Sequence, residues 1–422
     1  MSIVQTMDKK PVDIGIGIET VVVGAGQAGL ATGYHLQRQG RPFVILDANA
    51  RVGDHWRQQW DSLRLFTPAK YDALPGLPFP AKGWSFPGKD DVADYLEEYA
   101  KHWQLPIRLG VHVRRLSPTS DGGYLVTTDR ETYVCSNVVV ATGTFGKTPH
   151  VPAIARDLDP AIVQLHSSEY RRPSQLRDGP VLVVGASHSG TEIAYETAGT
   201  HATTLVGRDC GQIPVRHESW RMRLLFPILL FAWRHLLTRR TSMGRKEMAH
   251  LRFHGAPMLR VKSSDLATRG VERAYDRVEE VRSGRPVVGG EPRPVANVIW
   301  ATGFRQAFDW IQVPIVGEDG WPIELRGVVE RAPGLYFCGL SFQYAFSSML
   351  LAGVGRDAAH VASHIVAAAP SPARTHGERR RVGGGVTSSR VFGGVRRRAA
   401  SVVAGARLHT IQDPSRDKVD PS

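Results

Sequence analysis

The sequence predicts an α/β protein in which one βαβ unit occurs twice. Apolar residues lead into a glycine-rich turn at VVVGAGQAGL, residues 21–30, and again at VLVVGASHSG, residues 181–190. In both places a segment of helical length and a further apolar strand follow the turn. Each cycle closes on the tripeptide Ala-Thr-Gly, at 141–143 and at 301–303. This repeat of architecture predicts two domains of the same parallel-stranded class.

The predicted elements follow these two cycles. For the first cycle we expect strands at 20–23 and 41–47, helices at 27–39 and 90–103, and a β-meander at 110–116, 122–128 and 132–143. For the second we expect a strand from Val181, a helix at 189–198, a strand ending at Arg208, and short strands at 271–274, 276–281 and 285–288. The pattern is completed by strands at 295–304 and 334–340 and a helix ending near Ala368. Residues 210–270 show no clear pattern of helices or strands.

Length and composition are those of a globular protein with two or three domains. The chain has 422 residues, of which 42% are apolar and 22% are charged. Cys135, Cys210 and Cys338 form no C-x-x-C pair, which excludes a zinc ribbon, a redox dithiol motif and a disulfide framework. The histidines show no metal-binding spacing, so we assign no metal. The first residues lack the apolar core of a signal peptide, and we expect a reducing, cytoplasmic location.

The net charge of +13 is concentrated near the C-terminus. Residues 370–422 contain eleven Lys and Arg against four Asp and Glu, and therefore carry +7 of the total. We expect 369–422 to be a disordered basic tail, either solvated or in contact with a polyanion or a membrane surface. Because the excess charge lies there, we expect no nucleic-acid partner for the body of the protein.

One apolar run raises the question of a membrane. LLFPILLFAWRHLL, residues 224–237, is too short to span a bilayer and contains Pro227 and Arg234. It predicts either a packed helix or an access helix that touches lipid or gates an apolar substrate. We therefore expect no membrane span, and a peripheral contact stays open for this run or for the tail.

The first glycine turn has the spacing of a dinucleotide-binding motif. In Gly24-x-Gly26-x-x-Gly29 the first glycine permits the tight turn, the second lets a pyrophosphate approach the backbone, and the third allows close packing of helix and strand. The helix N-terminus offers N–H groups and a partial positive charge to the phosphates. Asp47, at the end of the next strand, suits a hydrogen bond to a ribose.

The second turn differs from the first at two positions. Ser187 replaces the middle glycine between Gly185 and Gly190, and the following strand ends in Arg208 instead of an acid. A guanidinium can bind a 2′-phosphate, which an acid would repel, so Arg208 favours NADPH over NADH; the alternative is a surface arginine paired with Asp209. We expect a resident FAD at the first turn and an exchanging NADPH at the second, with hydride transfer between them.

The block GDHWRQQWDSLRLFTP at 53–68, taken with the two turns and the two Ala-Thr-Gly segments, resembles the flavin-containing (class B) monooxygenases. The resemblance covers roughly 18–368. It extends to Baeyer–Villiger enzymes and plant auxin-forming flavin monooxygenases, and it is strongest for bacterial CzcO-like oxidoreductases associated with ion transport. It implies two Rossmann-like domains: FAD binding by 18–168 and 294–368, NADPH binding by 169–293, and a β-meander insertion.

The resemblance also implies site residues. The expected FAD contacts are Gly24, Gly26, Gln27, Ala28, Gly29, Asp47, Trp56, Arg57, Arg64, Leu65, Thr67, Val113, Ala141, Thr142, Gly143 and Gly339. The expected NADPH contacts are Gly185, Ser187, His188, Ser189, Gly190, Arg208, Ala301, Thr302 and Gly303. No catalytic side chain is evident, and the candidates at the flavin edge are Thr67, Gln343, Tyr344 and Ser347, the last at the start of a helix aimed at the flavin.

The family signature around a central histidine is present only in part. In PAIVQLHSSEYRRP, His166 and Tyr170 match, whereas Pro160 and Ile162 stand where Phe and Gly are usual. This departure weakens assignment to any one subfamily and leaves the superfamily unaffected. His166 is either a structural residue at the domain crossover or part of a linker that responds to NADPH.

Three functions remain open at this stage. The first is an NADPH-dependent flavin monooxygenase that acts on a small organic substrate with O₂ through a C4a-peroxyflavin. The second is an NADPH-dependent flavin reductase or oxidase that passes electrons to a quinone, a protein or oxygen. The third is a nucleotide-sensing flavoprotein that regulates ion transport. We expect the monooxygenase, with a homodimer allowed.

Overall fold

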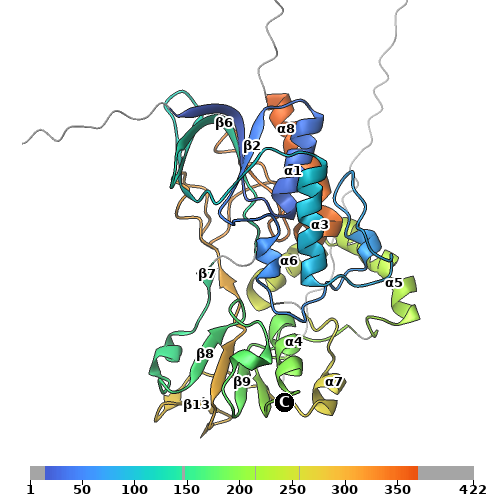
Figure 1. Ribbon diagram of the computed structural model, residues 1–422, viewed down its shortest axis with the longest axis vertical. Coiled ribbons are helices and arrows are strands. Elements are labelled where there is room, and N and C mark those ends of the chain that lie inside the picture. Colours follow the sequence, from blue (N-terminus) through green and yellow to red (C-terminus); the bar gives the residue numbers. More distant parts are fainter. Residues whose placement is uncertain (1–14, 145–147, 214, 256, 369–422) are drawn as a thin grey trace, which may run out of the picture. The chain divides into compact units, whose positions relative to one another are not determined.

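The computed structural model describes residues 15–144, 148–213, 215–255 and 257–368 (Figure 1). All of them lie within one compact unit, Met1–Pro370. The predicted tail at 369–422 lies outside the described residues.

The first sheet joins the first βαβ unit to the meander. Its strand order is β3 (Ile107–Leu109), β2 (Phe43–Asp47), β1 (Ile16–Val23), β6 (Thr132–Val140), β5 (Tyr124–Thr128) and β4 (Val113–Pro118), and β17 (Leu335–Phe337) also pairs with β6. The strand β6 is long enough to serve both parts. Its first half pairs antiparallel with β5 and its second half pairs parallel with β17, while β1 runs parallel along its other side.

Alternation along these strands buries both faces of the first sheet. Val22 and Val139 point to the face covered by α1 (Gln27–Arg38), α3 (Lys89–His102) and α8 (Leu351–Ala368), which lie side by side in Figure 1. Val21 and Val138 point to the other face, where Phe308 and Ile311 cover them. The α/β prediction is confirmed.

The second sheet is entirely parallel. Its order is β11 (Glu272–Ala274), β10 (Thr203–Val206), β9 (Val181–Val184), β15 (Asn297–Trp300) and β8 (Val163–His166). Helices α4 (His188–Thr197) and α7 (Ser263–Thr268) pack on it through Ile193 and Leu266. Because β8 and β15 belong to this sheet, it draws on residues outside the segment 169–293 predicted for it.

Several predicted boundaries were wrong in detail. The strand expected to end at Arg208 ends at Val206, and the strand expected from 110 begins at Val113. Of the strand expected at 276–281, only Val281 is in a strand, β12 (Val281–Arg282). The helix expected near Ser347 is first a 3-10 turn, Phe346–Met349, and α8 begins at Leu351. The Ser348 hydroxyl accepts hydrogen bonds from the N–H groups of Tyr344 and Ala345, which tightens this turn, and Leu350 is extended.

The remaining elements are short or lie in residues 210–270, for which the sequence predicted no clear pattern. That segment contains α5 (Trp220–Phe231), a π-turn (Ala232–Leu236) and α6 (Ser242–His254). The short helical turns are α2 (Asp54–Arg57), Ala69–Tyr71, Ala153–Asp157 and Pro173–Gln175. The short strands are β12 (Val281–Arg282), β13 (Arg285–Val288) and β14 (Glu291–Pro292), which pair together, and β7 (Thr148–Pro149) with β16 (Phe304–Arg305). Among the described residues, no helix has the length and apolar character required to cross a membrane.

Candidate functional site

The first glycine turn joins β1 to α1 and lies against the first Ala-Thr-Gly segment. The N–H of Gly24 donates to the Leu46 carbonyl at 2.7 Å, and the N–H of Ala141 donates to the Val23 carbonyl at 2.9 Å. Gly24 has a φ of 106°, and a Cβ there would lie 2.7 Å from the Ala141 carbonyl oxygen. Both the backbone angle and the close approach of Ala141 therefore require glycine at this position.

The other two glycines of the turn meet different demands. A Cβ on Gly29 would lie 1.8 Å from the Gly24 carbonyl oxygen, so this glycine lets α1 pack on the turn. Gly26 is the N-cap of α1, with φ −77° and ψ −174°, and a Cβ built on it has no atom of the described chain within 4 Å. Gly26 thus leaves an open space at a helix N-terminus, which is where a pyrophosphate fits.

Asp47 lies beside this open space at the end of β2. One carboxylate oxygen accepts a hydrogen bond from the Ala25 N–H at 2.6 Å. The other accepts hydrogen bonds from the backbone and side-chain N–H groups of Asn49, both at 2.8 Å. The protein therefore fixes the carboxylate next to the turn, as the predicted ribose contact requires.

The second turn reproduces the packing of the first. The N–H of Gly185 donates to the Val206 carbonyl at 2.7 Å, and that of Ala301 donates to the Val184 carbonyl at 2.8 Å. Gly185 has a φ of 111°, and its Cβ would lie 2.3 Å from the Ala301 carbonyl oxygen. A Cβ on Gly190 would lie 1.8 Å from the Gly185 carbonyl oxygen and 3.0 Å from the Ala301 side chain. The structure therefore brings Gly185, Gly190 and Ala301 together as it does Gly24, Gly29 and Ala141.

The position that corresponds to Gly26 is different. Ser187 is the N-cap of α4 with a φ of −82°, an angle that any residue adopts. The C-cap of α6, Gly255, lies so close that a Cβ there would be 2.8 Å from the Ser187 hydroxyl oxygen. The space at the N-terminus of α4 is thus partly filled by the Ser187 side chain and flanked by α6, whereas the space at the N-terminus of α1 is open.

Arg208 lies two residues beyond the end of β10, and it is exposed. Asp209 instead receives a hydrogen bond from the Gly211 N–H at 2.8 Å, and the described residues show no ion pair between it and Arg208. Arg273, in the neighbouring strand β11, donates to the carbonyls of Leu205, Gly207 and Arg208. It therefore braces the turn that carries Arg208. Sequence reasoning missed Arg273, although carboxyl ends of adjacent parallel strands meet at one edge.

A buried ion pair lies at the start of α4. Glu192 is 2% exposed and pairs with the Arg260 guanidinium, with nitrogen–oxygen distances of 2.5 and 3.1 Å. His188 lies 3.5 Å from the same carboxylate, and burial lowers the pKa of this imidazole. The expected cofactor contact His188 therefore lies between Glu192 and the ring of Phe66. Neither Glu192 nor Arg260 was predicted, because their pairing depends on a contact across 68 residues.

The C-terminal segment meets the first turn. A Cβ on Gly339, whose φ is 87°, would lie 2.7 Å from the Cβ of Ala28. The Thr144 hydroxyl accepts a hydrogen bond from the Ser341 N–H at 2.6 Å, and the Gln27 side chain donates to the Met349 carbonyl at 2.9 Å. The structure therefore gathers the turn, the 141–144 segment and 339–349, with Thr144 as a link that sequence reasoning missed.

The candidates for the flavin edge have unlike surroundings. Thr67 is buried and its hydroxyl donates to the buried carboxyl of Asp72. Gln343 is fully buried and its side-chain oxygen accepts a bond from the Leu340 N–H at 3.4 Å, so it braces the 339–343 turn. Tyr344 is flanked by the guanidinium groups of Arg326 and Arg356 at 4.4 and 4.7 Å from its ring, and the hydroxyl of the buried Ser347 lies 3.5 Å from Arg356.

The residues carried over from the Trp- and Arg-rich loop are engaged mainly with the protein itself. Arg57 donates to Asp94 and Glu97 of α3 at 2.7 and 2.8 Å, and Arg64 donates to the Phe86 carbonyl at 3.2 Å. Leu65 is buried in the same core that Trp56 packs against, and Val113 lines the core on the opposite face of the sheet. Contact of these five residues with a cofactor stays a prediction.

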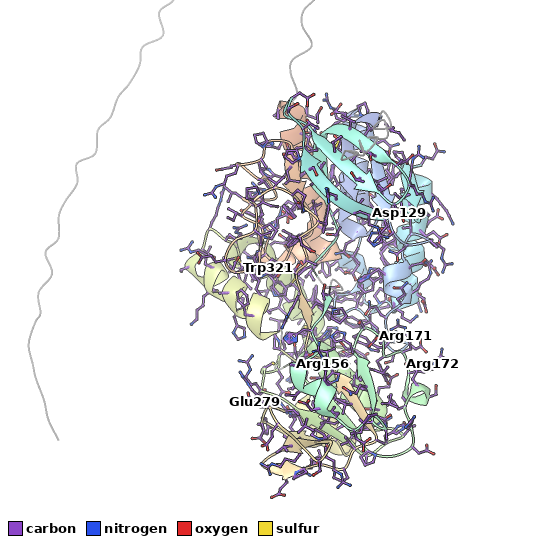
Figure 2. All side chains as sticks on the ribbon, turned by 90° about the vertical axis from the view of Figure 1, so that its left-hand side faces the viewer. Asp129, Arg156, Arg171, Arg172, Glu279 and Trp321 are labelled. Atoms are coloured by element: carbon purple, nitrogen blue, oxygen red, sulfur yellow. The ribbon has the colours of Figure 1, made fainter. Side chains whose placement is uncertain are left out.

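The loop is also tied to the β8–β9 connection. The Asp61 N–H donates to the carbonyl of Arg171 at 2.8 Å, and the Asp61 carboxylate pairs with Arg172 at 3.3 Å. Figure 2 labels both arginines. The loop predicted to line the first cofactor is thus held against the connection between β8 and β9, and β9 leads directly into the second glycine turn.

His166 joins β8 to the second Ala-Thr-Gly segment. One ring nitrogen lies 3.0 Å from the Gly303 carbonyl oxygen, and the other lies 2.8 Å from the Ser168 hydroxyl. Burial lowers the pKa of this imidazole. Tyr170 is fully buried and donates to Glu196 at 2.8 Å. These contacts favour the structural interpretation of His166, which fastens 303 beside β8.

Two hollows lie near these segments. One of about 560 Å³ lies between α3 and 79–87, and Arg64 is on its rim. The other, of about 360 Å³, is lined by Ala73–Pro75, Arg234, His235 and the start of α8. The smaller one is the better candidate for a substrate, because it adjoins the segment that meets the first turn. Among the described residues, no group of His, Cys, Asp or Glu is arranged to hold a metal.

Two sheets with matching glycine turns define an oxidoreductase of the FAD/NADP-binding fold. Residues 21–222 match the family model described as pyridine nucleotide-disulphide oxidoreductase. The chain is 36% identical to the uncharacterized CzcO-like oxidoreductase of Geobacillus kaustophilus, over 83% of this chain and 98% of the relative. It therefore belongs to the CzcO-like oxidoreductases, within the flavin-containing monooxygenase superfamily.

Solved structures support the same relationship. A mutant flavin monooxygenase from Stenotrophomonas maltophilia is 26% identical and superimposes with a TM-score of 0.67, covering 83% of this chain and 99% of that one. A complex of OTEMO with FAD and NADP is 17% identical, with a TM-score of 0.58 and coverage of 83% and 85%. The predicted resemblance is confirmed.

Proposed function

We propose that this protein is an FAD- and NADPH-dependent monooxygenase that acts on a small organic substrate with O₂. Membership of the flavin monooxygenase superfamily supports the reaction class. The similarity to the OTEMO complex, whose structure holds FAD and NADP, supports two dinucleotide sites through the shared fold.

One observation carries the proposal. Gly24 and Gly29 are required by the packing of the chain itself, whereas Gly26 faces open space in an ordinary backbone conformation. Nothing among the described residues needs glycine at 26, and a side chain there would fill the space in front of the α1 N-terminus. A glycine with no structural need at that place is best explained by a bound pyrophosphate.

The chain's own residues would position the two cofactors. Asp47 would accept hydrogen bonds from the ribose of the FAD, and the α1 N-terminus would hold its pyrophosphate. Arg208, on the turn braced by Arg273, would bind the 2′-phosphate of NADPH. When bound, the flavin supplies hydride acceptance and the activation of O₂. The N-terminus of α8, which begins at Leu351, would favour negative charge on the cofactor.

The cysteines favour this chemistry over that of the disulfide reductases. Burial raises the pKa of Cys135 and Cys338 to about 12, and the pKa of the part-buried Cys210 is also raised. A thiolate is the species that attacks a disulfide, and these environments disfavour it. Electrons from the flavin would therefore go to oxygen or to a non-thiol acceptor. An NADPH-dependent reductase or oxidase is the second candidate, because a nucleotide-disulphide oxidoreductase model matches 21–222.

The test combines a spectrum with a product measurement. The purified protein is expected to be yellow with releasable FAD, and NADPH should bleach it without air. After oxygen is admitted, a monooxygenase in the presence of its substrate class yields oxygenated product with little hydrogen peroxide. Organic sulfides, amines and ketones are suitable first substrates. Hydrogen peroxide equal to the NADPH consumed with every one of them would favour the oxidase, and the absence of bleaching would exclude both enzymes.

A further inference from the structure

Helix α5 carries two apolar stripes, and one of them is packed against the protein. Met222, Phe226 and Leu230 are buried, as is Trp233 in the π-turn that follows. The ring of Phe226 stacks on Tyr71 at 5.1 Å. This stripe attaches the helix to the protein, and Figure 1 shows α5 at the edge of the molecule.

The second stripe faces away from the protein. Trp220, Leu224, Ile228 and Phe231 expose 66%, 67%, 64% and 58% of their surface. At about 100° of rotation per residue, these four side chains lie within about 80° of one another around the helix. We call them the apolar face of α5. A continuous row of large exposed apolar side chains is uncommon on monomeric proteins and marks an interaction surface.

The charged residues from Ser219 to Lys246 all have one sign, and the exposed Glu218 lies just before the helix. Residues 219–246 contain no Asp or Glu. They contain seven basic residues, Arg221, Arg223, Arg234, Arg239, Arg240, Arg245 and Lys246. On the helix, Arg221 and Arg223 fall on opposite sides of the apolar row, and both are exposed. An aromatic and aliphatic stripe with cations along both edges is the pattern of helices that lie in a membrane interface.

Two other occupants fit this surface poorly. A second copy packed in parallel on the same face would bring Arg221 and Arg223 against their equivalents, where like charges repel. The C-terminal segment 370–422 has eleven Lys and Arg against four Asp and Glu, so its charge also opposes this surface. An anionic lipid surface supplies both an apolar phase and the complementary charge.

We propose that the apolar face of α5 docks the protein on anionic lipid membranes, with the helix in the plane of the interface. Trp220, Leu224, Ile228 and Phe231 enter the boundary between headgroups and acyl chains, and Arg221 and Arg223 contact lipid phosphates. The inner stripe of the same helix packs on Phe66, Tyr71 and Phe346, beside the residues expected at the flavin edge. If the proposed function holds, docking would place that edge near substrates dissolved in the lipid.

Vesicle flotation with the full-length protein tests the docking, and it requires no turnover. Vesicles of equal parts phosphatidylglycerol and phosphatidylcholine should bind the protein, and pure phosphatidylcholine should bind it about tenfold more weakly or less. The pair Leu224→Gln and Ile228→Gln should weaken binding to the anionic vesicles at least about tenfold. Glutamine keeps the helix, so flavin content and melting temperature should be unchanged.

Matched variants assign the effect to this face. Ile323→Gln with Leu325→Gln removes two exposed apolar side chains elsewhere and should leave binding unchanged. Arg221→Gln with Arg223→Gln should weaken binding to anionic vesicles mainly at low salt. This variant replaces the Leu224→Gln and Ile228→Gln pair as the test if that pair does not fold. Glutamine at Arg379–Arg381 and Arg396–Arg398, in the intact chain, should weaken binding less than the changes in α5.

Three results would overturn the proposal. The first is that the full-length protein does not bind anionic vesicles. The second is that binding survives both changes in α5 and is lost with the tail arginines, which would assign it to the tail. The third is a dimer in solution that the Leu224→Gln and Ile228→Gln pair dissociates while vesicles bind neither form, which would assign the face to a second copy of the chain.

Discussion

Gly190 lies so close to Gly185 that a Cβ added to it would be 1.8 Å from the Gly185 carbonyl oxygen. The same distance separates a Cβ on Gly29 from the Gly24 carbonyl oxygen. In each turn the third residue of the helix is glycine, and its lack of a side chain lets the helix pack closely on the end of the strand. The two turns therefore share the same close packing of helix on strand, and they differ at the N-cap of the helix, which is Gly26 in the first turn and Ser187 in the second.

Substitution of Gly26 should separate cofactor binding from folding. Gly26→Val is expected to abolish FAD retention while the protein stays folded, because the new side chain meets no protein atom but fills the pyrophosphate space. The flavin absorbance per protein and the melting temperature measure the two effects. Gly17→Val is the control, since Gly17 also faces open space and has no expected ligand. A folded Gly26→Val protein with full FAD content would contradict the assignment of the first site.

Substitution of Gly190 should have the opposite result. Gly190→Ala forces a methyl group against the Gly185 carbonyl oxygen and the Ala301 side chain, and overpacking of this kind costs about 1–3 kcal/mol or more. We expect a lower free energy of unfolding, measured by chemical denaturation. Ser189→Ala, one position earlier, is the comparison and should change stability much less. Equal stability of Gly190→Ala and the parent protein would show that the turn relaxes.

Arg208 should decide the choice between the two nicotinamide coenzymes. Arg208→Ala removes a charge-assisted contact with the 2′-phosphate, worth about 1.5–3 kcal/mol, which is about 10- to 150-fold in NADPH affinity. Affinity for NADH should change little. Titration of both coenzymes measures this, with the exposed Arg277→Ala as the control. Equal losses for NADPH and NADH would mean that Arg208 has another role.

Asp72 should make stability depend on pH. Burial raises the pKa of this carboxyl to about 7 from an ordinary value of 3.8, although the Thr67 hydroxyl works in the opposite direction. The folded state therefore holds the proton more tightly than the unfolded state, and the stability it gives is full below about pH 4 and is lost as pH rises through about 7. Relative to the parent protein, Asp72→Asn should gain a few kcal/mol between these limits. Unfolding of both proteins across this range measures the difference, and a constant difference would contradict the raised pKa.

The glycine turns and the strands beside them could be predicted because their signals are local. The apolar strand, the spacing of Gly24, Gly26 and Gly29, and the acid at the end of the next strand all lie within residues 20–47. The confirmed elements have the same character: β2 ends at Asp47 and α8 ends at Ala368, as predicted. The errors lay at the ends of elements, where one hydroxyl such as that of Ser348 decides whether a turn or a helix forms.

Contacts between distant segments could not be predicted. Arg273 reaches the carbonyl of Leu205, and Arg260 reaches Glu192, each across 68 residues. Arg57 donates to Asp94 and Glu97 of α3, a helix whose packing against this loop no local pattern reveals. The exposure of the apolar face of α5 was equally hidden, because a run such as 224–237 has the same letters whether one stripe or both are buried.

The sequence by itself determined the α/β class, the two glycine turns and the family, since short-range spacing and the restricted backbone of glycine encode them. Only the tertiary structure decided which glycines serve the chain and which one faces open space. It also decided that Ser187 lies beside Gly255, that Arg208 is exposed, and that α5 presents Trp220 and Leu224 to the outside. The physical reason is that burial and close approach depend on segments far apart in the chain, which meet only when the sheets and helices have packed.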